Sequence, residues 1–143
     1  MESHKVVLEP IHPEAYRLTY TCLLIPRLPA HQIKDKLASD LENWLNEICA
    51  AQNWQVEFVA VNDAYLQWGL RVVSSIQMGQ FMKEIRSKTS ELVLSNYTDL
   101  RSADPASDFW APGYLVVLGT RPHPKEMIKY YIRLARRQQG FKE

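Results

Sequence analysis

The sequence predicts an α+β domain with a ferredoxin-like architecture, in which two helices cover one face of an antiparallel sheet and a further helix ends the chain. Stretches of alternating polarity and stretches with apolar residues three and four positions apart follow one another in the order β-α-β-β-α-β-α. A short polar turn between the second and third strands predicts a hairpin. With 143 residues, the chain has room for one hydrophobic core rather than two. We therefore expect a single site, on the sheet face that those two helices leave free.

The first strand and the first helix are predicted from residue type and spacing. Residues 16–25, YRLTYTCLLI, are rich in β-branched and aromatic side chains and end at Pro26. Residues 31–51 place apolar side chains at helical spacing, which predicts an amphipathic helix. These side chains are Ile33, Leu37, Leu41, Trp44, Leu45 and Ile48.

The next two strands are predicted as a hairpin around the turn Asn62-Asp63. In the first of them, alternate side chains are expected to share one buried face. The residues of that face are Trp54, Val56, Phe58 and Ala60. The second, residues 64–73, alternates as well and so has two distinct faces. These faces hold Leu66, Trp68, Leu70 and Val72 on one side and Tyr65, Gln67, Gly69 and Arg71 on the other.

The second half of the chain continues the same pattern. Residues 77–95 carry apolar side chains at helical spacing and predict the second helix. Residues 96–112 are rich in Asn, Asp, Ser and Pro, which is typical of a loop. Residues 113–119, GYLVVLG, are predicted as a strand, and the last helix is expected from Lys125 to about Gln139, where Gly140 stops it.

The composition is that of an ordinary globular protein, with 46% hydrophobic and 23% charged residues. No apolar run approaches the roughly 20 residues of a membrane span, and the N-terminal segment does not resemble a secretory signal. We expect a cytoplasmic protein with an N-terminal arm at residues 1–15 and the domain at residues 16–143. Cys22 and Cys49 show neither a disulfide framework nor the spacing of a zinc site, so we expect reduced thiols.

Basic residues are concentrated at the C-terminal end, although the formal net charge of the chain is only +1. Residues 121–143 carry seven basic and two acidic side chains. Because salt limits each charge to a neighbourhood of about 8–10 Å, such a segment can bind phosphate in a nearly neutral protein. A solvated helix face explains the same charges and is the better explanation on charge alone.

Several segments, taken in order, resemble the insertion-sequence tyrosine transposases that move single-stranded DNA, a group that includes the repeat-associated tyrosine transposases. The first strand leads into a basic turn, YRLTYTCLLIPR, and residues 85–94, IRSKTSELVL, are similar to a helix of the family. Residues 109–119, FWAPGYLVVLG, and 127–132, MIKYYI, are similar to the family's Trp-containing loop, Gly-Tyr strand and final helix. The resemblance runs from about Tyr16 to Gln139, and it implies the same fold and a symmetric homodimer.

In that family, the HUH motif holds a divalent metal with two histidines separated by one hydrophobic residue, on a strand that lacks histidine here. Side chains at i and i+2 of a strand share a face, so two imidazoles can bind one ion that polarises the scissile phosphate. The two positions fall on Tyr65 and Gln67 if the alternation holds, or on Ala64 and Leu66 if Asp63 takes the place of the residue before the pair. We prefer the first register, because a slip of one residue exchanges the buried and exposed faces. Both registers remove both imidazoles, so we expect no metal cofactor.

The tyrosine that attacks the DNA phosphate in this family corresponds to Tyr131, which precedes Ile132 as in the family's Tyr-Ile pair. A phenol with a pKa of about 10 is a weak nucleophile that needs the help of the metal. The family's further metal ligand, usually Gln, corresponds to Ala135, with Gln138 and Gln139 close by. Tyr131 and Ala135 also share one helix face, so core packing and residual function explain Tyr131 equally well.

Basic and aromatic side chains together predict a groove for single-stranded nucleic acid, in which phosphates meet cations and bases stack on rings. Stacking contributes about 1–3 kcal/mol per base where it occurs. For Trp110, burial under a loop is the commoner outcome for a tryptophan in such a place. The candidate binding residues are Arg71, Lys125, Lys129, Arg133, Arg136, Arg137, Tyr65 and Trp110.

Three functions remain open at this point. The first is a transposase-like protein that binds single-stranded or hairpin nucleic acid, DNA ahead of RNA, but has lost phosphodiester chemistry. The second is an active transposase or nickase that holds Mg²⁺ or Mn²⁺ through unusual ligands such as Gln67, Asp63 and Gln138. The third is a protein-interaction or regulatory module that does not bind nucleic acid. No membrane partner is expected for any of them.

Overall fold

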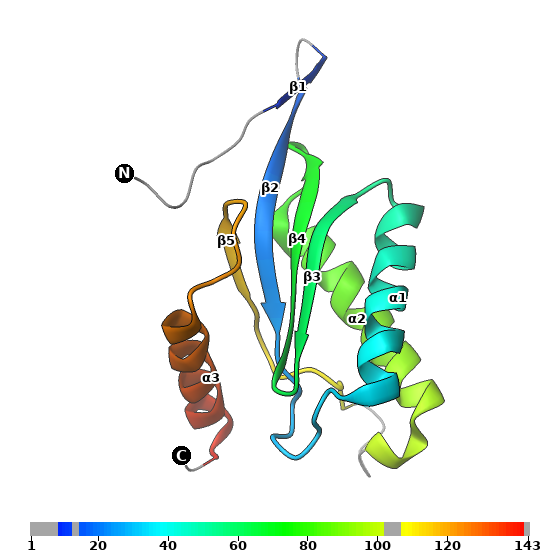
Figure 1. The fold of residues 1–143 in the computed structure, drawn as a ribbon, viewed down its shortest axis with the longest axis vertical. Coiled ribbons are helices and arrows are strands. Elements are labelled where there is room, and N and C mark those ends of the chain that lie inside the picture. The colour runs from blue at the N-terminus through cyan, green and yellow to red at the C-terminus, as the bar shows by residue number, and fades with distance from the viewer. Residues whose placement is uncertain (1–8, 13–14, 102–106, 142–143) are drawn as a thin grey trace.

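Five strands of the described chain form one antiparallel sheet that lies between helices α1 and α2 on one side and helix α3 on the other (Figure 1). The computed structural model describes residues 9–12, 15–101 and 107–141. The central strand β2 (Ala15–Leu24) pairs with β4 (Tyr65–Val73) along one edge and with β5 (Leu115–Leu118) along the other. With β3 (Gln55–Asn62) beside β4, the order is β5-β2-β4-β3, and the expected ferredoxin-like α+β class is confirmed.

The three helices are α1 (Asp35–Ala51), α2 (Met78–Asn96) and α3 (Lys125–Gln139). The bounds of α3 agree with the sequence prediction, and Gly140 ends the helix with a left-handed φ of 95°. Helix α1 begins later than the expected residue 31. A turn precedes it, in which the N–H of His31 bonds to the carbonyl of Leu28, and the N–H of Ile33 is tied to the carbonyl of Asp63 in the β3–β4 turn.

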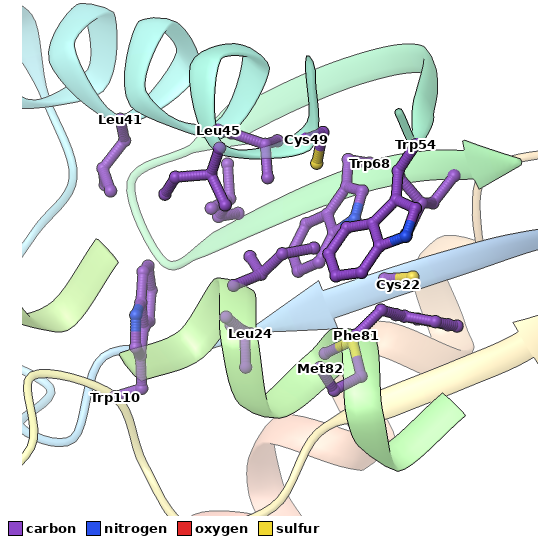
Figure 2. Close-up of a cluster of buried hydrophobic side chains, with 14 of the residues drawn as sticks. Cys22, Leu24, Leu41, Leu45, Cys49, Trp54, Trp68, Phe81, Met82 and Trp110 are labelled. Atoms are coloured by element: carbon purple, nitrogen blue, oxygen red, sulfur yellow. The ribbon is translucent and has the colours of Figure 1, made fainter. Parts of the chain in front are cut away.

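The main core lies between the sheet and the layer of α1 and α2. Leu41, Leu45 and Cys49 point from α1 into this core, which also holds the large rings of Trp54, Trp68 and Trp110 (Figure 2). Both cysteines are free and buried, and burial raises the pKa of Cys49 to about 12, so this thiol stays protonated at neutral pH. The side chains that β4 contributes to this core are the predicted set, Leu66, Trp68, Leu70 and Val72.

The expected buried face of β3 is wrong beyond its first half, because a bulge interrupts the strand. Val56 pairs with Leu70, but the next paired residue is Phe58, so Glu57 is the extra residue. One inserted residue exchanges the faces of all that follow. Val59 and Val61 therefore pack against the main core instead of Phe58 and Ala60. Phe58 lies on the opposite face, where its ring covers Gly69.

The sequence prediction assumed that the second face of the sheet is open. In the structure, α3 packs on part of that face (Figure 1). A second, smaller core joins this helix to the sheet and to the segment before β5. Its buried members are Leu23, Ile25, Ala111, Ile128 and Ala135. The terminal helix therefore serves as a packing layer as well as a basic surface.

Two elements were not predicted. Strand β1 (Glu9–His12) lies in the expected N-terminal arm and pairs with the start of β2. The one-turn 3-10 helix η1 (Thr98–Leu100) lies in the expected loop, of which residues 102–106 fall outside the described part. No helix in the described ranges combines the length and the apolar character needed to cross a membrane.

Candidate functional site

The terminal helix α3 brings most of the sequence-predicted site residues to one side of the molecule. It begins after Pro124 and ends with Arg136 and Arg137 in its last turn, where positive charge complements the helix dipole. Its inner face packs on the sheet through Ile128 and Ala135, both buried, while Tyr131 is half-buried at the edge of the same cluster. Its outer face carries basic side chains into solvent.

Tyr131 points toward the segment that precedes β5. Its hydroxyl lies 3.9 Å from the place where a Cβ atom on Gly113 would stand. Burial raises the pKa of Tyr131 above its usual value, while the nearby positive charges of Arg86 and Arg136 act in the opposite direction. Because desolvation outweighs the two cations, the phenol is harder to ionise than a free tyrosine. This is the reverse of what an attacking phenolate requires.

The two residues that take the place of the family's histidine pair in the preferred register lie on the α3 face of the sheet. Tyr65 packs against the second core together with Tyr131. Gln67 is buried and pairs with Leu23 of that core, and its side-chain oxygen accepts a hydrogen bond of 2.7 Å from the backbone N–H of His123. In the other register, Leu66 lies in the main core on the far side of the sheet and Ala64 lies in the turn.

These side chains do not fit a divalent metal. Around Tyr131 they offer a phenol, an amide oxygen that already accepts a backbone hydrogen bond, and the methyl group of Ala135, whereas such ions select carboxylate or imidazole donors. Within the described ranges, His, Cys, Asp and Glu nowhere gather as three or more potential ligands. Asp63 stands in the β3–β4 turn, 3.8 Å from the ammonium of Lys34, and Gln138 is exposed on α3.

The predicted basic residues of α3 divide into two groups. Lys125, Lys129, Arg133 and Arg137 are exposed. Arg136 instead points inward, where one guanidinium nitrogen donates 2.9 Å hydrogen bonds to the carbonyl of Arg27 and to the side-chain oxygen of Gln139. Arg136 therefore fastens the end of α3 to the turn after β2, and its assignment to a phosphate track stays a prediction.

Arg71 shares the α3 face of the sheet but lies near its other end. It pairs with Thr19 on that face, six residues along β4 from Tyr65. At about 3.3 Å per residue, this places the two positions about 20 Å apart. Arg71 therefore lies toward the opposite end of β4 from Tyr65.

Trp110 is not available for stacking on bases, because its side chain has no exposed surface. Its ring packs in the main core against Phe109, and its indole N–H donates a 2.9 Å hydrogen bond to the hydroxyl of Thr89 on α2. The expectation that Trp110 is an aromatic platform is thus wrong for this conformation, and Trp110 instead anchors the segment before β5.

Sequence reasoning missed Arg86, which organises that segment beside Tyr131. Its guanidinium lies 2.9 Å from the carboxylate of Asp108 and donates to the carbonyls of Gly113 at 3.1 Å and Trp110 at 3.4 Å. A signal was present in the sequence. Arg86 occupies the same stripe of α2 as the buried residues Met82 and Thr89, where an unpaired charge would be costly.

A shallow pocket with a volume of about 300 Å³ opens between α3 and the turn that joins β3 to β4. Tyr65 contributes to its wall, and Lys125 and Lys129 line it from α3. The pocket therefore joins an aromatic ring to part of the exposed basic surface.

The chain matches a protein family by sequence and solved structures by fold. The family model described as "Transposase IS200 like" matches residues 14–135. A solved structure of a putative transposase from Deinococcus radiodurans R1 superposes with a TM-score of 0.77 at 18% identity, over 89% of this chain and 97% of that one. A REP-associated tyrosine transposase bound to a REP hairpin superposes with a TM-score of 0.53 at 11% identity, over 87% of this chain and 70% of that one. No curated protein matches the sequence. At these identities the solved structures establish a shared fold.

Proposed function

This chain belongs to the family of IS200-like transposases, and on that premise we propose that it is a member that binds nucleic acid but no longer cleaves phosphodiester bonds. Cleavage in the family needs a bound ion and an activated tyrosine together. Here the side chains around Tyr131 provide neither a set of metal ligands nor an easily ionised phenol.

The observation that carries this proposal is the hydrogen bond between Gln67 and His123. In the preferred register, Gln67 occupies the second of the two ligand positions. Its oxygen, the one atom there that resembles a ligand, is buried and accepts the backbone N–H of His123 at 2.7 Å. One lone pair of that oxygen is therefore already engaged, and a single amide oxygen holds a divalent ion far more weakly than two imidazoles do.

The proposed partner is single-stranded or hairpin nucleic acid, with DNA preferred to RNA. The related structure with a REP hairpin supports a hairpin as the kind of ligand to test. The exposed basic surface of α3 supports binding through phosphates, since its side chains reach solvent on one side of the molecule. The members of this surface are Lys125, Lys129, Arg133 and Arg137.

We also propose a homodimer joined through β5. Within the described residues, β5 pairs only with β2, so its outer edge presents unpaired backbone groups. Tyr114, just before β5, and Leu118, at the end of β5, are exposed. Two copies related by a two-fold axis would extend one sheet across both chains. Light scattering at micromolar concentration should give the mass of a dimer, and the mass of a monomer would contradict this.

Binding is tested with a DNA hairpin that carries single-stranded flanks, titrated at several salt concentrations. The variant Lys129→Gln/Arg133→Gln should bind more weakly, and the slope of log affinity against log salt should fall by about one to two, because each phosphate contact to a single strand contributes roughly 0.7. The matched control is Lys83→Gln/Lys88→Gln on α2, at two exposed residues on the opposite side of the sheet. If neither DNA nor RNA binds at low salt, a module without nucleic-acid binding is the better description.

Loss of chemistry is tested separately. The same DNA is incubated with the protein and Mg²⁺ or Mn²⁺, and the products are resolved under denaturing conditions. We expect neither cleavage nor a covalent protein–DNA adduct. An adduct that disappears in Tyr131→Phe would instead identify an active transposase with unusual metal ligands.

A further inference from the structure

The pocket between α3 and the β3–β4 turn combines two kinds of surface. Its apolar part is formed by Ile128 and Ile132 of α3 together with the ring of Tyr65 from the start of β4. Its polar part is formed by Lys125 and Lys129 on the same helix and by Asn62 at the end of β3. A ligand that fills it must therefore present a flat or apolar group beside a charged one.

The charged residues of the pocket favour an anionic ligand. None of the residues that line it is acidic, and both of its charged residues are exposed lysines. Two carboxylates lie close by. Asp63 is 3.8 Å from the ammonium of Lys34, outside the pocket, and Glu126 is 3.6 Å from the ammonium of Lys129, an exposed ion pair of the weak kind that a phosphate can displace. Two ammonium groups one helical turn apart on one helix face suit a phosphate.

The uncharged residues of the pocket favour a ligand with an aromatic ring and a polar edge. Tyr65 lines the pocket with a half-buried aromatic side chain, and an aromatic ring is a surface on which any base can stack. The amide oxygen of Asn62 accepts the backbone N–H of Ala64 at 3.0 Å, which holds this side chain at the pocket and leaves its amide N–H groups to donate to a ligand. An apolar floor, an aromatic wall and an amide donor are the elements that hold a nucleobase.

We propose that this pocket holds one unpaired nucleotide of a bound strand, with its base against Tyr65 and the two isoleucines and its phosphate at Lys125 and Lys129. The volume of about 300 Å³ is at the lower end of the range of small-ligand sites, about 300–1,000 Å³, and thus suits one nucleotide rather than several. This inference rests on the proposed nucleic-acid binding and adds to it a site that distinguishes unpaired from paired nucleotides.

The test uses hairpin DNA in which the fluorescent base 2-aminopurine replaces one nucleotide at a time, in the stem or in the single-stranded flanks. Binding should change the fluorescence strongly at one flanking position and little at stem positions. Ala64→Phe should remove this signal and weaken binding about tenfold, because an exposed residue that lines the pocket then fills it. The same change at Ala51, which is exposed at the end of α1, is the matched control and should leave both unchanged.

Three outcomes separate this inference from the proposed function. If hairpins bind and Ala64→Phe has no effect on affinity or fluorescence, the pocket proposal is overturned and nucleic-acid binding stands. If no nucleic acid binds, both are overturned. A second variant, Tyr65→Leu, should likewise weaken binding of the flanked hairpin and spare binding of a blunt hairpin, and equal loss on both would also overturn the pocket proposal. Free dAMP that competes as well as the strand would assign the pocket to mononucleotides and would overturn the proposal of a strand nucleotide.

Discussion

The two faces of the sheet are built differently, although the same strands supply both. The face under α1 and α2 carries a continuous apolar core with three tryptophans and two phenylalanines, all buried. The face under α3 carries an apolar cluster of only five buried residues, two of them alanines, with half-buried tyrosines at the margin and lysines around it. Stability should therefore depend mainly on the first face, while the second remains adaptable enough to hold a site. The sheet itself is common to both layers.

The largest expected effect is on the free energy of unfolding, and it is measured by truncating one buried side chain in each of the two layers. Phe81→Ala empties a site at the centre of the main core and should lower the free energy of unfolding by about 3–5 kcal/mol. Ile128→Ala lies beside the open pocket, where the surroundings can relax, and should cost about 2 kcal/mol. Urea unfolding of both variants measures the difference. Equal losses in the free energy of unfolding would contradict the conclusion that stability depends mainly on the core under α1 and α2.

A polar contact inside the main core comes next. Thr89→Val keeps the shape of the side chain but removes the hydroxyl that accepts the indole N–H of Trp110. A buried donor without an acceptor costs about 1–3 kcal/mol, so the midpoint of urea unfolding should fall. Ser87→Ala, on the exposed side of the same helix, is the control and should change the midpoint little. An unchanged midpoint for Thr89→Val would mean that Trp110 is not anchored in this way.

The α3 face has its own steric constraint at Gly69. A Cβ atom there would stand 2.6 Å from a ring carbon of Phe58, so Gly69→Ala forces the ring to move. We expect a loss of about 1–2 kcal/mol in the free energy of unfolding, since a half-buried ring can shift at moderate cost. Adding Phe58→Leu should recover part of that loss in a double-mutant cycle. If the losses of the two single variants simply add in the double variant, the ring of Phe58 does not cover Gly69.

The smallest expected effect is the pH dependence that Tyr131 contributes. Burial raises the pKa of this phenol in the folded chain above its usual value of about 10. The folded state then binds more protons than the unfolded state at alkaline pH, so stability is complete below pH 10 and is lost as pH rises through the folded pKa. As pH rises past the usual tyrosine pKa of about 10, Tyr131→Phe should therefore lose less stability than the unmodified protein. Tyr130→Phe, whose ring is 62% exposed, is the control.

Several features could be predicted because each depends on neighbouring residues alone. The order of strands and helices follows from polarity patterns, and the end of α3 follows from Gly140. The bulge at Glu57 could not be predicted, because Val59 and Val61 are as apolar as Phe58 and Ala60, and the alternation fits either face. Only pairing with β4 selects between them.

The candidate site shows the same division. The absence of histidine from the strand that becomes β4 is evident from the residues themselves, and so is the basic end of the chain. The inward turn of Arg136, the burial of Trp110 and the role of Arg86 depend on partners that are 21 to 109 positions away in the chain. Periodicity assigns a residue to a face, but it does not show what lies opposite.

By itself, the sequence determined the family, the fold class and the absence of histidine from the strand that becomes β4, because these depend on which residues stand in which order. The tertiary structure alone decided that α3 packs on part of the second face of the sheet, that Gln67 accepts the backbone N–H of His123, and that the phenol of Tyr131 is half-buried. The reason is physical. Burial and hydrogen bonding are properties of pairs of segments in contact, and contacts between distant segments form only when the chain has folded.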